Sequence, residues 1–238
     1  MRKRRARRRL NWGPVLWLLF VVNVAAGLTW SRATSAQVVR VYGALPYDEA
    51  RISQQAQFLK DVPCLRVDKA RIEEKVGFAP EVRTVELRRN VFGRAELRVQ
   101  YREPVARLAG STTAYLSDEG VLFTQSVERT DLPSLKLDGE LDANLAYASP
   151  WPLGRLVQVA KEATLRESLQ NAEIQVFRSG AVCLNLQTAT RIQLGPLEAI
   201  GEKFKAYDEL LQSNPNLLKD ASELILVAPS RPAFKKRT

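Results

Sequence analysis

The chain has 238 residues, of which 36 are Lys or Arg and 26 are Asp or Glu, and it contains no His. The absence of His excludes Ser-His-Asp and Cys-His catalysis as well as zinc sites that depend on imidazole. Two Cys cannot supply a four-thiolate metal site, and no Gly-rich phosphate-binding loop of a standard pattern is present. We therefore expect a protein that is not an enzyme and that uses no metal, cofactor or small-molecule substrate.

The net charge of +10 is concentrated at the two ends of the chain. Residues 1–9 carry seven positive charges and residues 231–238 carry four, with no acidic residue in either stretch. The remainder holds 25 of the 36 basic residues against all 26 acidic ones. A body that binds nucleic acid needs a basic surface of its own, so this distribution argues against nucleic-acid binding.

Residues 10–31 form a stretch of 22 residues without a charge. As a helix that rises about 1.5 Å per residue, the stretch is long enough to cross the roughly 30 Å hydrocarbon core of a membrane. Trp12 and Trp30 stand near its ends, where amphipathic rings favour the membrane interface. The positive-inside rule then places residues 1–11 in the cytoplasm and the body of the chain outside. The alternative is a secretory signal cleaved near residues 34–36, although the apolar stretch is longer than the core of a usual signal.

The first segment after this stretch predicts the order strand, helix, helix, strand, strand. Apolar residues at helical spacing predict a helix over 52–59, and Asp68 is placed to cap a second helix. The alternation of apolar and polar side chains predicts strands at residues 39–43, 84–88 and 94–101.

The second segment, residues 106–228, mixes helices and strands in an order that predicts an α+β domain on a mostly antiparallel sheet. Amphipathic spacing predicts helices over 152–169 and 197–211. Asp118 and Glu119 are the one acidic pair that suggests acid–base chemistry, but they immediately precede Gly120, as polar residues do in a hairpin turn. Further strands are expected at residues 174–177, 182–186, 191–194 and 224–227.

Cys64 and Cys183 are the two cysteines of the chain. They lie 119 positions apart and in different predicted domains. Two separate buried thiols therefore fit better than one disulfide, even in a compartment that permits disulfides. The sequence leaves open whether both thiols are free.

The junction between the two segments resembles that of a known family. The first segment begins just outside the predicted membrane helix, has the element order of a POTRA domain, and closes with Tyr-Arg-Glu-Pro-Val-Ala at 101–106. Residues 115–123 then predict a strand, an Asp-x-Gly type of turn and a strand, and a Leu-Pro segment follows at 132–135. With the basic tail and the single membrane helix, this order of parts resembles the bacterial cell-division family FtsQ, called DivIB in some lineages.

The resemblance implies an α+β protein with a single transmembrane helix, a POTRA domain (β-α-α-β-β) and a second α+β domain. The expected parts are a basic cytoplasmic tail (1–11), the transmembrane helix (12–31), a linker (32–37), the POTRA domain (38–105), the FtsQ-type β domain (106–228) and a basic C-terminal tail (229–238). The implied function is that of a non-catalytic scaffold of the divisome, placed in the cytoplasmic membrane at the division septum. The implied partners are FtsB/DivIC-like and FtsL-like coiled-coil membrane proteins.

The partner site is expected on the last predicted strand, which comprises Glu223, Leu224, Ile225, Leu226, Val227 and Ala228. As the final apolar run of the domain, this strand is expected at or near a sheet edge, where unpaired backbone groups accept an added strand. The resemblance implies the same place, although Leu-Ile-Leu at 224–226 stands where the family often carries an Asp-containing run. An interior strand is the alternative.

Two other functions remain open. A membrane-anchored enzyme with a Ser-Lys dyad needs no His, but no spacing in the sequence singles out a pair. A POTRA-bearing translocation or assembly component would continue into a long membrane β-barrel. The second segment, with two amphipathic helices, does not supply one.

Overall fold

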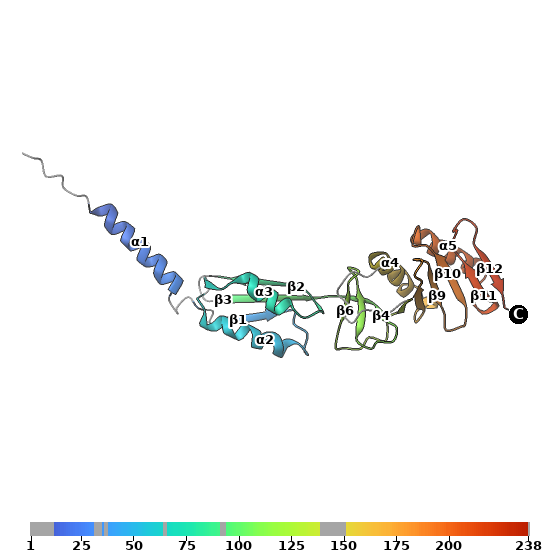
Figure 1. The fold of residues 1–238 in the computed structure, drawn as a ribbon, viewed down its shortest axis with the longest axis horizontal. Coiled ribbons are helices and arrows are strands. Elements are labelled where there is room, and N and C mark those ends of the chain that lie inside the picture. Colours follow the sequence, from blue (N-terminus) through green and yellow to red (C-terminus); the bar gives the residue numbers. More distant parts are fainter. Residues whose placement is uncertain are drawn as a thin grey trace, which may run out of the picture. The chain divides into compact units, whose positions relative to one another are not determined.

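The structure, a computed structural model, describes residues 12–30, 35, 38–63, 66–90, 94–138 and 151–237 (Figure 1). The predicted tail 1–11, the linker 32–37 apart from Ser35, and Cys64 lie outside these residues. The chain divides into two compact units, one ending at Tyr101 and the other beginning at Arg102. Helices and strands occur in both units, and the predicted α+β class is confirmed.

Helix α1 (Gly13–Trp30) covers most of the charge-free stretch. Its large apolar side chains, such as Leu16 and Phe20, are exposed. Its polar side chains bond within the helix: Asn23 Nδ2 donates to the Leu19 carbonyl (2.9 Å) and Thr29 Oγ1 to that of Ala25 (3.0 Å). Among the described residues, no helix combines the length and the apolar character that a membrane span requires.

The rest of the first unit is a three-stranded sheet covered by helices. Its order is β1-β3-β2, with β1 parallel and β2 antiparallel to β3. Figure 1 shows α2 beside β1 and α3 in front of β2, and buried residues such as Ile52 and Leu97 form the core. The elements are β1 (Val38–Tyr42), α2 (Glu49–Gln57), η2 (Phe58–Asp61), α3 (Lys69–Gly77), β2 (Val82–Arg89) and β3 (Arg94–Tyr101).

Local chemistry sets the boundaries of these elements. Asp68 caps α3 as predicted, because its Oδ1 accepts from the Arg71 amide (3.3 Å). The predicted helix over 52–59 changes at Phe58 into the tighter turn η2. Gly43 follows β1 with a φ of +80°, and a Cβ there would lie 2.3 Å from the Val99 carbonyl oxygen of β3. Only glycine fits this approach without displacing the central strand.

The second unit is built on a nine-stranded sheet within the described residues, in the order β12-β11-β10-β9-β8-β7-β4-β5-β6. The parallel pairings are β4–β7, β7–β8 and β10–β11. All the others are antiparallel, so this is a mixed sheet in which antiparallel pairings outnumber parallel ones. The strands are β4 (Pro104–Leu108), β5 (Ala114–Ser117), β6 (Leu122–Thr124), β7 (Ser134–Leu137), β8 (Glu173–Val176), β9 (Val182–Asn185), β10 (Arg191–Gly195), β11 (Ala221–Ile225) and β12 (Ala233–Lys236).

Helices cover one face of this sheet and share a single apolar core with it (Figure 1). Leu156 and Ala160 come from the first long helix, and Phe204 and Tyr207 come from the second. The helical elements are α4 (Leu153–Thr164), η4 (Glu167–Leu169), α5 (Ile200–Ser213) and α6 (Leu217–Asp220).

Three sequence-based boundaries in this unit differ from the structure. The unit begins four residues before the predicted boundary at 105/106, because Pro104 already belongs to β4. The predicted helix over 197–211 begins only at Ile200, since Ala199 has a left-handed backbone (φ 49°). The predicted helix over 152–169 breaks after Thr164 and resumes as η4.

The acidic pair Asp118 and Glu119 lies in the turn between β5 and β6, as predicted. Gly120 has a φ of +79°, and its amide donates to the Ser117 carbonyl (3.0 Å). Glu119 Oε2 accepts from Arg102 Nη1 (2.6 Å), so this carboxylate is held in an ion pair. A Cβ on Gly120 would approach Gly154 Cα to 2.9 Å, so the turn packs directly on the start of α4.

A buried polar cluster closes one end of the first unit. Asp48 is 3% exposed, and its Oδ2 accepts from Tyr101 Oη (2.7 Å) and from Arg51 Nη2 (2.7 Å). Tyr101 Oη in turn accepts from the Leu45 amide (3.4 Å). Because the hydrogen bonds from Arg51 outweigh the desolvation of the carboxylate, the pKa of Asp48 lies below its ordinary value.

Asp48→Asn is expected to lower the free energy of unfolding of the first unit by about 1–3 kcal/mol at pH 7, because a charge-assisted, buried bond to Arg51 is lost. A carboxyl whose pKa is lower in the folded state contributes stability above its unfolded pKa of about 3.9 and loses it as the pH falls through the folded value. The difference between wild type and variant should therefore shrink below about pH 4. Urea unfolding between pH 3 and 7 measures it.

The control is Glu86→Gln, which removes an exposed carboxylate paired with Arg88 (2.9 Å). Exposed pairs contribute little to stability, so this variant should unfold like the wild type. Equal stability of Asp48→Asn and Glu86→Gln at pH 7 would contradict the role given to the cluster.

Candidate partner-binding strand

The predicted partner strand lies inside the sheet. Strand β11 pairs in parallel with β10, where Arg191 faces Glu223, and antiparallel with β12, where Phe234 faces Leu224. Glu223 accepts a hydrogen bond from the Gln193 side chain, and Leu224 and Leu226 are fully buried. Strand β11 is therefore the second strand from the edge of the sheet, as in the interior-strand alternative, and residues 223–228 do not form the edge itself. The backbone of β11 is paired on both sides, with β10 on one and β12 on the other.

The last two residues of the predicted site, Val227 and Ala228, follow β11 instead of extending it. Both are exposed, with Val227 at 43%. They lead into a turn in which the Arg231 amide donates to the Ala228 carbonyl (3.0 Å). Pro229 lies within this turn and Pro232 follows it, so the chain reverses here before β12.

The sheet continues into the residues that were assigned to a basic tail. Within residues 229–238, Ala233–Lys236 form β12, which pairs antiparallel with β11. This strand was not predicted, because it contains two lysines and only one large apolar residue, Phe234, and so has no alternation of apolar and polar side chains. Lysines on a strand are typical of sheet edges, where they discourage unwanted pairing. The two adjacent lysines were therefore the feature of the sequence that could have indicated an edge strand here.

The edge of β12 can be assigned residue by residue. The Arg237 amide donates to the Asp220 carbonyl (2.7 Å), so the backbone of this residue points toward β11. Backbone groups alternate along a strand. The amides of Phe234 and Lys236 and the carbonyl of Phe234 therefore point away from β11, and in the described part of the sheet no strand pairs with them. The Lys236 carbonyl accepts a hydrogen bond from Ser222 Oγ (3.5 Å).

Side-chain contacts hold β12 in place. A register shift between Ala221 and Glu223 marks a β-bulge in β11, and Ser222 Oγ there donates to the Lys235 carbonyl (3.3 Å). Arg237 Nη2 donates to the Thr188 carbonyl (2.7 Å) in the loop before β10. The edge is thus a formed strand.

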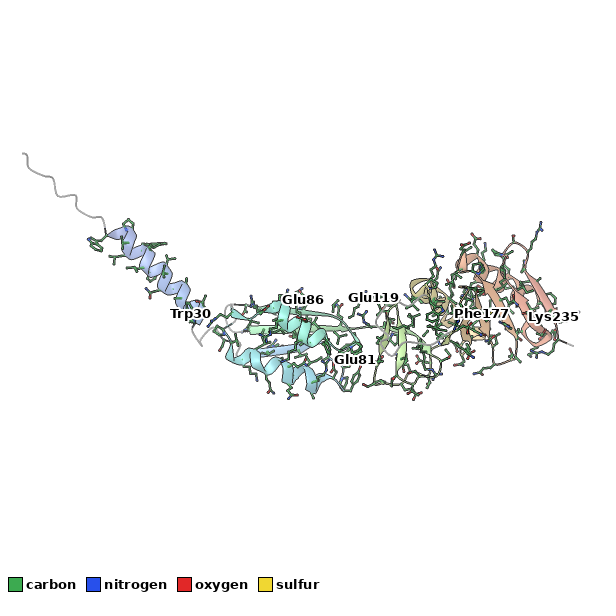
Figure 2. All side chains as sticks on the ribbon, viewed as in Figure 1. Trp30, Glu81, Glu86, Glu119, Phe177 and Lys235 are labelled. Carbon is green, nitrogen blue, oxygen red and sulfur yellow. The ribbon has the colours of Figure 1, made fainter. Side chains whose placement is uncertain are left out.

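The two faces of β12 differ in character. Phe234 lies opposite buried Leu224 and is 45% exposed, so it extends the apolar face of the sheet beyond its last covered position. Lys235, labelled in Figure 2, lies opposite Glu223 on the other face. With Lys236 and Arg237 the edge is cationic. A strand with an apolar residue beside Phe234 and acidic residues beside the lysines would complement it.

The opposite edge of the same sheet is less suited to partner binding. Strand β6 has three residues, and two of them, Leu122 and Phe123, are buried. The Phe123 ring packs against Tyr115 with centroids 6.1 Å apart.

The other predicted residues are placed as follows. Trp12 immediately precedes α1 and Trp30 ends it, and both rings are exposed. Cys183 is a buried free thiol on β9, with Arg191 Nη2 3.6 Å from its Sγ. The buried thiol of Cys183 agrees with its prediction, and the membrane-interface role of the two tryptophans stays a prediction.

Lys203 is a buried lysine that the sequence did not single out. Its Nζ donates to the carbonyls of Leu194 (2.8 Å) and Pro196 (2.5 Å) at the end of β10, and burial lowers the pKa of its ammonium. These bonds hold the loop before α5 in place. The lysine therefore has a structural role, and its two bonds go to backbone carbonyls.

Comparison with protein-family models and with curated proteins found no match for this chain.

Proposed function

We propose that the protein is a membrane-anchored, non-catalytic scaffold of the FtsQ/DivIB kind that binds coiled-coil division proteins outside the cytoplasmic membrane. The observation that carries the proposal is the edge strand β12, where the amides of Phe234 and Lys236 and the Phe234 carbonyl have no strand partner among the described residues. Such an edge binds an extended segment by strand addition.

The first unit supports the proposal through its topology. The order β1, α2, α3, β2, β3, with β3 central and parallel to β1, is the arrangement expected of a POTRA domain. We propose that this unit is a POTRA domain of the scaffold. Its sheet and helices form a core separate from that of the second unit, as a two-domain scaffold requires.

Helix α1 supports the proposed anchor by its surface. Its 18 residues extend about 27 Å, close to the roughly 30 Å of the hydrocarbon core. The charge-free stretch in the sequence is longer, at 22 residues, and a short span is accommodated by local thinning of the bilayer. Asn23 and Thr29 bond to carbonyls of their own helix, as polar groups in lipid must. By the positive-inside rule, the seven charges in residues 1–9 support an N-terminus in the cytoplasm.

The proposed binding step is the addition of one partner strand to β12. The partner's backbone would bond the outward amides of Phe234 and Lys236 and the Phe234 carbonyl, which gives affinity without regard to sequence. Specificity would come from an apolar partner residue beside Phe234 and acidic residues beside Lys235 and Lys236. An FtsB/DivIC-like protein with an acidic, apolar-alternating segment after its coiled coil fits this description.

The test of this function is localisation. A fluorescent protein fused before residue 1 should give a band at midcell in dividing cells, and a chain truncated after residue 228 should lose its partner while keeping its place in the membrane. A uniform envelope signal from the full-length fusion in dividing cells would contradict the divisome assignment.

A further inference from the structure

A pocket of about 460 Å³ opens in the first unit, lined by Leu59 of η2, by residues 62 and 66–68, and by helix α3. Its floor is apolar and includes Leu59, Val67 and Ile72, all of which are buried. This volume is in the range of about 300–1,000 Å³ that is typical of small-ligand sites.

The rim of this pocket is cationic. Arg66, Arg71 and Lys75 line it and are exposed, against a single carboxylate, that of Asp68. The Asp68 carboxylate is engaged in capping α3 through the Arg71 amide (3.3 Å). An apolar floor under a cationic rim favours a ligand with a negative head and an apolar body.

The pocket lies a short chain distance from the outer end of α1. Trp30, labelled in Figure 2, ends α1, and Ser35 five residues later forms a β-bridge with Pro63, next to the pocket residue Val62. Five extended residues span at most about 17 Å. The Arg66 guanidinium also lies 5.6 Å from the centroid of the Trp30 ring.

We propose that this pocket binds an anionic phospholipid of the membrane leaflet that faces the body of the chain. The phosphate would be bound by Arg66, Arg71 and Lys75, and the start of an acyl chain would contact Leu59 and Ile72. The inference rests on the proposed function in one respect, that α1 lies in the membrane. The headgroup layer is about 5–8 Å thick on each side of the core, so it is within reach of the short tether.

The apolar floor distinguishes a lipid from a free anion. Inorganic phosphate would use the rim alone, whereas the floor offers apolar area that only an amphiphile can cover. Each cation beside an anionic surface raises affinity about fivefold, so the rim favours anionic over zwitterionic lipid. The bound lipid would fix the first unit at the membrane surface beside Trp30.

The test uses the full chain reconstituted in nanodiscs of phosphatidylcholine, with or without phosphatidylglycerol. Hydrogen exchange of the amides of α3 should be several-fold slower in discs that contain phosphatidylglycerol. Arg66→Gln/Arg71→Gln removes two cations and should lower affinity for the anionic lipid about 25-fold, which abolishes the difference between the discs. The matched control is Arg88→Gln/Arg98→Gln, two exposed arginines of the same unit outside the pocket, and it should keep the difference.

Several results would overturn the inference. One is equal exchange of α3 in both discs for the inserted wild-type chain, and another is loss of the difference in both double variants, which would indicate a diffuse charge effect. Slower exchange on addition of inorganic phosphate to phosphatidylcholine discs would indicate an anion site without lipid specificity. A chain that fails to co-purify with either disc would overturn the proposed anchor and, with it, this inference. Equal exchange in a chain that does insert overturns this inference alone, so the two failures can be told apart.

Discussion

Replacing Lys236 by Pro is expected to weaken binding of the FtsB/DivIC-like partner by about 10–100-fold. The Lys236 amide points away from β11, so proline removes a donor that only an added strand would use. Its ring also occupies the space that the partner backbone needs, and prolines on edge strands are a known device against pairing. The residue before a proline favours an extended conformation, so β12 itself should persist.

Two variants separate the backbone contribution from charge and from folding. Lys236→Ala keeps the amide and loses only the charge, so it should weaken binding about fivefold or less. Lys235→Pro removes an amide that points toward β11, so it should loosen β12 and lower the free energy of unfolding as well. Affinities are measured by titration of the solubilised chain with the partner. Equal affinity of Lys236→Pro and wild type would exclude strand addition at this edge.

Replacing Gly43 by Ala is expected to lower the free energy of unfolding of the first unit by about 2–5 kcal/mol. The left-handed backbone costs a residue with a Cβ about 1–2 kcal/mol, and overpacking against a fixed group adds about 1–3 kcal/mol. The fixed group is the Val99 carbonyl oxygen, 2.3 Å from the new Cβ, on the central strand β3. Urea unfolding of the solubilised chain measures the effect.

The matched control is Gly110→Ala in the second unit. Gly110 has nearly the same backbone, with a φ of +82°, but no atom lies within 4 Å of the position of a Cβ. This variant should therefore show the conformational cost alone. If the two variants lose equal stability in their own units, the close approach of Gly43 to β3 has no energetic consequence.

Local patterns predicted the helices and most strands because their evidence is contained in a few neighbouring residues. Asp68 predicts the start of α3 because it can cap the helix, and Gly120 predicts a turn because glycine adopts a positive φ. Pairings over a long sequence distance leave no such mark. The parallel contact of β4 with β7, and of β10 with β11, depends on how the chain packs as a whole.

The candidate site shows the same limit. The strand predicted at 224–227 overlaps only the end of β11 (Ala221–Ile225), and its place in the sheet depends on whether another strand follows. That strand, β12, carries Lys235 and Lys236, and its residues are exposed. A strand that has little to bury gives no apolar pattern. The two lysines were a weak sign of an edge strand, but they did not show that this strand pairs with β11.

The most direct test of the central claim is hydrogen exchange of the β12 amides with and without the FtsB/DivIC-like partner. In the free chain, the outward amides of Phe234 and Lys236 should exchange rapidly, while the Arg237 amide, bonded to Asp220, should be slower. In the complex, Phe234 and Lys236 should become protected, because a partner strand accepts their hydrogen bonds. A complex that forms while both amides continue to exchange at the free rate would contradict strand addition at β12 and with it the proposed mode of partner binding.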